Sequence, residues 1–171
     1  MKGYIPVEIP TKRYIKAYIH FKLGEKAFMN TECNIGSKLY DVLNHKTNEE
    51  KSRFSNVRYN TTLRLYVSYH TFTHRGAFLN ETNIKNFNLY VEGIIKDRFR
   101  LYMDFYISIL PSFEANLPEV RKNLGIDIED WSDDSMRKDY YRYRLYKGKP
   151  LLYEKNNAAT VPSVINQNFG F

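Results

Sequence analysis

The chain has 171 residues, of which 26 are lysine or arginine and 19 are aspartate or glutamate, so its net charge is +7. A chain of this length forms one domain, or one domain with an appendage, and can bury its own core; its single cysteine excludes an internal disulfide. The positive charge favours polyanionic partners such as nucleic acid, and no uncharged apolar stretch is long enough to predict a membrane-spanning helix. No signal-peptide pattern is present near the N-terminus, so we expect a cytoplasmic protein.

A small body of strands and helices is predicted for residues 1–79. Residues 4–9 alternate weakly and predict a strand at a sheet edge, because Pro6 cannot donate to a strand ladder. Thr11 is the expected N-cap of the helix that follows. Gly24 is the expected residue just beyond the end of that helix.

The next segment is less regular. It predicts a strand through residues 27–29 and a short helix over residues 38–45, with Ser37 as the cap of the helix. Residues 45–56 are polar and charged, and they predict an exposed loop.

Residues 61–73 carry the strongest strand signal in the chain. Apolar and polar residues alternate strictly over TTLRLYVSYHTFT, and many of them are β-branched or aromatic. This pattern predicts a half-buried strand that is long enough to be central in its sheet. His74 to Gly76 are the expected exit turn.

The longest helical pattern covers residues 80–110. Apolar residues recur there at spacings of three and four, and a second apolar row lies beside the first. Asn80 or Thr82 is the expected N-cap, and Pro111 is expected to end the helix. An apolar face this wide normally packs on the core, but it can also form the seam of a homodimer. A homodimer through helix 80–110 therefore stays open.

Residue types used in catalysis and metal binding do not form a known pattern in this sequence. His70 and His74 are expected on a strand and a turn, and no carboxylate or cysteine set has the spacing of metal ligands. Cys33 is interpreted as a small buried apolar residue. No glycine-rich phosphate loop and no nucleophile motif is present. The sequence therefore predicts no catalytic residue, no metal site and no cofactor.

Residues 113–149 give the strongest indication of a partner. A first short helix with Asn116 as its cap ends before Gly125. A second helix with Ser132 as its cap covers residues 133–147. Acidic residues at the start of the second helix and basic residues at its end suit the helix dipole, so this separation of charge along the axis needs no functional explanation.

The side faces of the second helix carry the functional interpretation. One face carries Met136, Tyr140, Tyr143 and Lys147, the opposite face combines cations with Tyr141, and Arg144 lies at the border. The helix dipole does not explain a tyrosine among cations. Arginine and lysine neutralise phosphates, and tyrosine bonds a phosphate or stacks on an exposed base. The expected nucleic-acid-binding residues are Arg137, Lys138, Tyr141, Arg142, Arg144 and Lys147.

The run LG…S…RKDYYRYR within residues 115–146 resembles helix-turn-helix DNA-binding proteins of phages and mobile elements, such as Mor-type activators. The resemblance implies that the second helix is a recognition helix. The turn from Gly125 to Ser132 is longer than this motif usually has. Asp133 and Asp134 repel phosphate, so the middle and C-terminal part of the helix is expected to make the contacts.

These observations predict an α+β fold with a small N-terminal strand and helix body, a long central helix and a C-terminal helical, helix-turn-helix-like part. Residues 1–79 form the body, residues 80–149 form the helical part, and residues 150–171 form an extended or disordered tail. The expected function is DNA binding without catalysis, as a small regulator or replication accessory of a phage or mobile element. One alternative is a virion or assembly protein that acts through self-association or contacts with other proteins. Another is a nucleic-acid enzyme such as a nuclease.

Overall fold

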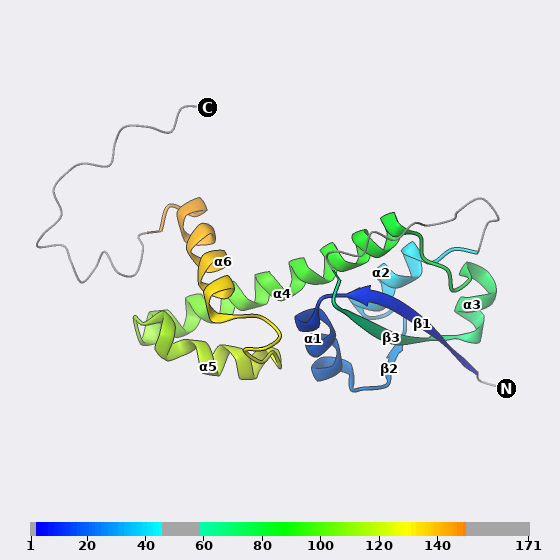
Figure 1. Cartoon of the computed structure of the whole chain (residues 1–171), viewed down its shortest axis with the longest axis horizontal. Helices are drawn as coiled ribbons and strands as arrows, with labels where there is room; N and C mark the ends of the chain where they lie inside the picture. The colour runs from blue at the N-terminus through cyan, green and yellow to red at the C-terminus, as the bar shows by residue number, and fades with distance from the viewer. Residues whose placement is uncertain (1–2, 46–58, 150–171) are drawn as a thin grey trace, which may run out of the picture.

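The computed structural model describes residues 3–45 and 59–149, and it shows a small sheet, helices packed on it and a helical extension (Figure 1). The expected α+β fold class is confirmed. Most of the loop expected at residues 45–56 and all of the tail expected at residues 150–171 lie outside the described residues. The elements are β1 (Tyr4–Thr11), α1 (Arg13–Leu23), β2 (Ala27–Met29), α2 (Asn34–Val42), β3 (Thr61–Ser68), α3 (Tyr69–Arg75), α4 (Glu81–Ile109), α5 (Phe113–Leu124) and α6 (Asp133–Tyr146).

Strand β3 is the centre of the sheet, whose order is β1-β3-β2. β1 pairs with it antiparallel, with Pro6 opposite Tyr66, and β2 pairs with it in parallel. The proline is tolerated because β1 is an edge strand, as expected. Every second residue points into the core, which contains Val7, Ile9, Ala27, Met29, Leu63, Leu65 and Val67.

The central strand is shorter than its alternating pattern predicts. β3 ends at Ser68, whose hydroxyl oxygen accepts a hydrogen bond from the backbone N–H of Thr71 at 3.1 Å. This bond caps α3, which ends at Arg75 and is followed by Gly76 with a φ of 78°. The expected strand is therefore wrong beyond Ser68, because the local cap redirects the chain into a helix although the side chains still alternate.

Helix α1 begins one residue later than expected. Thr11 is buried at the end of β1, where its hydroxyl donates to the side chain of Asn88 on α4, so Lys12 is the N-cap residue. Asn88 also donates to the backbone carbonyl of Pro10 at 3.0 Å, which joins β1 to α4. Gly24 follows the end of α1, as expected.

Two further helix starts differ from the expected caps. α2 begins before Ser37, because the Sγ atom of Cys33 accepts the backbone N–H of Gly36 at 3.2 Å and caps the helix. α5 begins before Asn116, because Ser112 is its N-cap residue. The amide of Asn116 donates instead to the carbonyl of Ser112 at 2.7 Å inside the helix. Polar residues inside a first turn are difficult to distinguish from caps by sequence alone.

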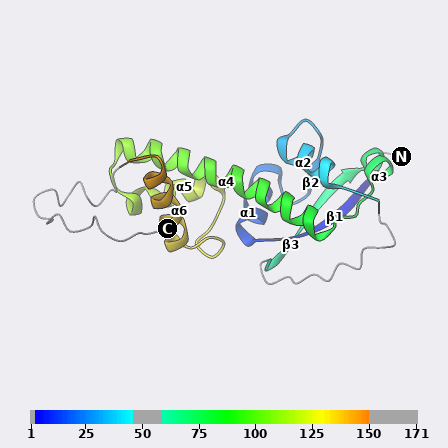
Figure 2. The ribbon, with the colours of Figure 1, turned by 90° about the horizontal axis from the view of Figure 1, so that it is seen from above.

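Helix α4 extends along both parts of the molecule and connects them (Figures 1 and 2). Asn80 caps it, as expected, by accepting the backbone N–H of Asn83 at 2.8 Å, and the helix ends before Pro111. Its N-terminal half packs on β1, α1 and α2, whereas its C-terminal half packs on α5 and α6. Its buried row consists of Ile84, Phe87, Asn88, Val91, Ile95, Phe99, Met103 and Ile107.

Candidate nucleic-acid interface

Helix α6 lies across the C-terminal half of α4, beside α5 (Figure 1). Ser132 caps it, as expected, and Met136, Tyr140 and Arg144 form its buried row. The hydroxyl of Tyr140 donates to the carboxylate of Asp104 on α4 at 2.7 Å. Burial and this hydrogen bond raise the pKa of the phenol, so Tyr140 stays a proton donor at neutral pH.

Asp104 anchors the C-terminal end of α6. It also accepts hydrogen bonds from the hydroxyl of Tyr143 at 3.0 Å and from the Nζ of Lys149 at 2.7 Å. Burial alone would raise the pKa of this carboxyl, but hydrogen bonds from Lys149, Tyr140 and Tyr143 outweigh burial and lower the pKa. These bonds fix which face of α6 points away from α4.

The connection between α5 and α6, residues 125–132, reaches back to the N-terminal body. Trp131 is buried between Tyr14 of α1 and Phe99 of α4, with ring centroids 5.0 Å and 5.2 Å away. Arg121 holds the same loop by donating to the backbone carbonyl of Asp127 at 2.9 Å. The turn is long because it carries Trp131 into the core, which is not the geometry of a short helix-turn-helix turn.

Two of the expected binding residues are engaged with α5. The guanidinium of Arg137 pairs with Glu114 at 2.9 Å and lies over the ring of Phe113. Tyr141 is half-buried, and its ring packs edge-on against Phe113. Both side chains therefore help to attach α6 to α5.

Arg144 is turned inward, which corrects the expectation that it contributes to an exposed surface. Only 8% of it is exposed. Its guanidinium lies over the ring of Tyr140 and donates to the Tyr140 hydroxyl at 3.3 Å. The periodicity of the helix places Arg144 at a border between two faces, but Tyr140, one turn earlier, offers it both a ring face and a hydroxyl.

The exposed side of α6 carries the remaining expected cations and an aromatic residue that the sequence analysis missed. Lys138, Arg142 and Lys147 are exposed. Tyr146 is 85% exposed and lies one helical turn beyond Arg142. Lys138, Arg142 and Tyr146, each four residues apart, form what we term the outer row. The spacing of four residues between them is visible in the sequence, and it indicates that Tyr146, rather than Tyr141, is the exposed aromatic residue on this face.

A polar cleft of about 440 Å³ lies beside the outer row, and Arg142 lines it together with residues of α1 and α4. The Nζ atoms of Lys12 and Lys96 each lie 2.7 Å from the carboxylate of Glu92 in this cleft. Burial alone would raise the pKa of Glu92, but these two ammonium groups lower it. The charges of Lys12 and Lys96 are therefore neutralised within the cleft by Glu92, and Arg142, which also lines the cleft, is exposed.

Other chemistry-bearing residues lie away from α6. His70 and His74 are one turn apart on α3, with ring centroids 4.3 Å apart, and not on a strand and turn as expected. Cys33 is half-buried as a helix cap, which corrects its interpretation as a buried apolar residue. In residues 3–45 and 59–149, no three His, Cys, Asp or Glu side chains are placed to hold a metal ion. No helix within these ranges is both long and apolar enough to cross a membrane.

The chain matches no protein-family model, no curated protein and no solved structure. The resemblance of residues 115–146 to helix-turn-helix proteins therefore stays a prediction.

Proposed function

We propose that this protein binds nucleic acid through the outer row of α6, as a small regulator or replication accessory that acts on duplex DNA. The observation that carries the proposal is the exposed aromatic ring of Tyr146 in line with the cations Lys138 and Arg142. Cations neutralise phosphates, and a tyrosine beside them bonds a phosphate or stacks on a base.

The exposed ion pair of Lys138 supports the proposal that the outer row contacts phosphates. Lys138 pairs with Asp134 at 2.7 Å, but both side chains are mostly exposed, so the pair contributes only about 0–1 kcal/mol. A phosphate can replace Asp134 at little cost. Asp133 and Asp134 lie at the N-terminal end of the helix, which leaves the C-terminal part, with Arg142 and Lys147, to meet the polyanion.

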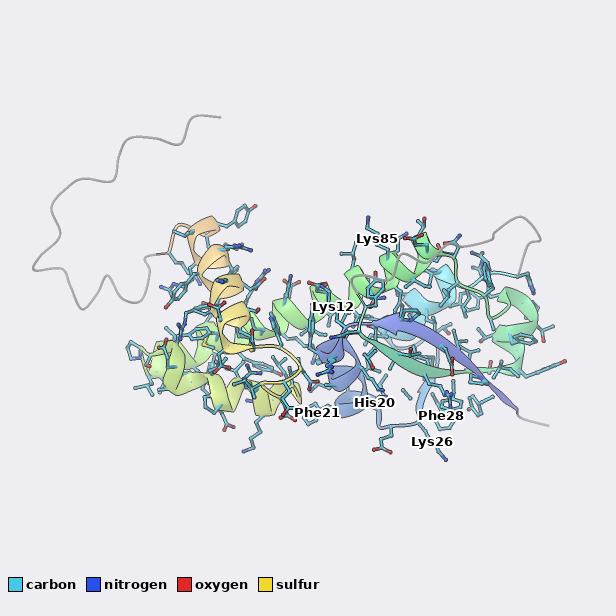
Figure 3. The ribbon with its side chains drawn as sticks, viewed as in Figure 1. Lys12, His20, Phe21, Lys26, Phe28 and Lys85 are labelled. Atoms are coloured by element: carbon cyan, nitrogen blue, oxygen red, sulfur yellow. The ribbon has the colours of Figure 1, made fainter. Side chains whose placement is uncertain are left out.

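A titration of labelled duplex DNA at several salt concentrations tests this proposal. Arg142→Ala is expected to weaken binding and to lower the slope of log K against log salt by about 0.9, the contribution of one phosphate contact. The matched control is Lys85→Ala, which removes one exposed cation at the N-terminal end of α4, away from α6 (Figure 3). Equal affinities and slopes for wild type and Arg142→Ala would contradict the proposed surface.

A second candidate function is assembly through self-association, and a specific observation favours it. Leu101, Phe105 and Ile109 are 66%, 59% and 68% exposed, and they are spaced by four residues on α4. They form an apolar strip on the face of the helix that points away from the core, and Leu110 lies beside its end. A contiguous exposed apolar strip of this kind is typical of a protein–protein contact, and it lies on the helix expected to form a homodimer seam.

A further inference from the structure

The sheet has a second face that is exposed in the described part of the chain. Helices α1, α2 and α4 pack against the face that carries the buried residues of the strands. On the other face, Tyr4 of β1, Phe28 of β2 and Arg64 of β3 are exposed, and Tyr66 is half-buried. Open sheet faces are normally polar, so three aromatic rings on one of them need an explanation.

The ring of Phe28 contacts the rings of both tyrosines, although the three residues come from three strands. The ring of Phe28 lies 4.6 Å from that of Tyr4 and 5.4 Å from that of Tyr66, measured between centroids. The register places Phe28 opposite Tyr66, because β2 pairs with β3 in parallel. About half of the Tyr4 and Phe28 side chains is exposed, at 51% and 50%. We term these three residues the aromatic platform.

Two hollows border the aromatic platform on opposite sides. Tyr4 lines a hollow of about 600 Å³ together with Ser68, His70 and His74. On the other side, Tyr66 lines a groove of about 440 Å³. This groove lies between β3 and α1, because β2 pairs with β3 only from Leu65 onwards. The platform therefore connects two depressions into which a chain-like ligand can continue.

The groove beside Tyr66 carries cations from two elements and the loop between α1 and β2. They are Lys16 of α1, Lys26 before β2 and Arg64 of β3. The groove also contains Glu8 and Glu25, but Glu8 is paired with Arg64 at 2.6 Å in an exposed and hence weak pair. Figure 3 shows Lys26 and Phe28 on the same side of the body. Cations beside exposed rings are the combination that binds a phosphate backbone and its bases together.

We infer that the aromatic platform is a binding site for single-stranded nucleic acid. Unpaired bases stack on Phe28, Tyr4 and Tyr66, and the phosphates contact Lys16, Lys26 and Arg64. Sheets that bind single strands use exposed rings in this way, whereas the bases of a duplex are already stacked and present only their edges. The inference rests on the proposed nucleic-acid binding, but it assigns a different surface and a different nucleic acid.

Fluorescence anisotropy with a labelled oligo(dT) single strand and with a duplex of equal length tests the inference on the full chain. Phe28→Ala is expected to weaken oligo(dT) binding by about 5- to 100-fold, the usual effect of losing one stacked base, and to leave duplex binding unchanged. Tyr90→Ala, which removes an aromatic ring from α4 on the covered side of the sheet, is the control and keeps both affinities. Circular dichroism checks that each variant is folded.

A second variant reports on stacking directly. Phe28→Trp, combined with Trp131→Phe, places the only tryptophan of the chain on the aromatic platform. We expect this variant to keep its affinity for oligo(dT), and its emission to be quenched when the strand binds. An unquenched tryptophan in a variant that still binds oligo(dT) would overturn the stacking geometry.

The outcomes separate this inference from the proposed function of α6. Oligo(dT) binding that depends on Phe28, with no duplex binding, supports the platform and contradicts the α6 surface. Duplex binding that depends on Arg142, with oligo(dT) bound equally by wild type and Phe28→Ala, overturns the platform and supports α6. Absence of binding to both probes contradicts both.

Discussion

The indole ring of Trp131 stacks on the phenol ring of Tyr14, with centroids 5.0 Å apart and ring planes 24° apart. Tyr14 belongs to the first helix of the body, and Trp131 belongs to the loop that precedes α6. Phe99 of α4 contacts the same indole. This contact joins the N-terminal body, the long helix and the C-terminal helices into one continuous core.

Replacement of Trp131 by alanine is expected to destabilise the fold by about 3–5 kcal/mol, because a large buried ring is lost and leaves a cavity. The measurement is urea unfolding followed by far-UV circular dichroism, since Trp131 is the only tryptophan. The control is Ile128→Ala in the same loop, where the side chain is 60% exposed and a change within about 0.5 kcal/mol is expected. Similar losses for both variants would show that the loop does not depend on this stack.

Gly125→Ala is expected to destabilise the protein for two reasons. Gly125 has a φ of 65°, and an alanine in this conformation costs about 1–2 kcal/mol. A Cβ atom there would also lie 2.1 Å from the Cγ of Phe21. The Cβ of Phe21 would lie 2.3 Å from the added Cβ as well, so Phe21→Gly is the background that removes these contacts, and Gly125→Ala should cost less there than in wild type. Additive effects of the two substitutions in thermal or urea unfolding would contradict the steric contact.

Asp104→Asn is expected to change how stability depends on acid pH. The hydrogen bonds that lower the pKa of Asp104 give a folded value below the unfolded value of about 3.9. The carboxylate therefore stabilises the fold fully above the unfolded pKa, and this contribution is lost as pH falls through the folded pKa. We expect Asp104→Asn to cost about 1–3 kcal/mol near neutral pH, the cost of weakening hydrogen bonds to a charged group.

The difference between wild type and Asp104→Asn should shrink below about pH 4, when unfolding is compared over a pH series. Asp97→Asn is the control, because the Asp97 side chain is 80% exposed and only a small effect is expected. A difference between wild type and Asp104→Asn that stays constant down to the lowest pH would show that the pKa of Asp104 is the same in the folded and unfolded states.

Self-association through the apolar strip of α4 predicts a concentration-dependent mass in light scattering. Phe105→Asp introduces a charge at the centre of the strip and should produce a monomer, because the charge would have to be buried without a partner. Leu89→Asp makes the same change on the N-terminal half of α4, where Leu89 is 55% exposed, and should leave the mass unchanged. A wild-type chain that scatters as a monomer at every concentration would exclude this interface.

The sequence correctly predicts those helices and strands that are specified by residues close together in the chain. Pro6 predicted an edge strand, Gly24 predicted the end of α1, and the spacing of apolar residues predicted α4; the structure confirms all three. Of the two expected caps of α4, Asn80 and Thr82, the structure shows Asn80. Predictions were wrong where two local signals compete. At Ser68 a helix cap and an alternating pattern overlap, and only packing decides between them.

The exposure of the residues in the two candidate sites cannot be predicted from the sequence. The sequence alone shows that residues 133–147 are rich in cations and tyrosines and that residues 64 and 66 alternate with apolar positions of a strand. The tertiary structure decided which of these groups stay exposed, because the partners come from distant segments. Glu114 forms an ion pair with Arg137. Asp104 of α4 accepts a hydrogen bond from Tyr140, and Arg144 is buried because its guanidinium packs on the ring of this tyrosine. Strand register likewise assembled the aromatic platform, because pairing across β1, β3 and β2 brings together side chains that are far apart along the chain.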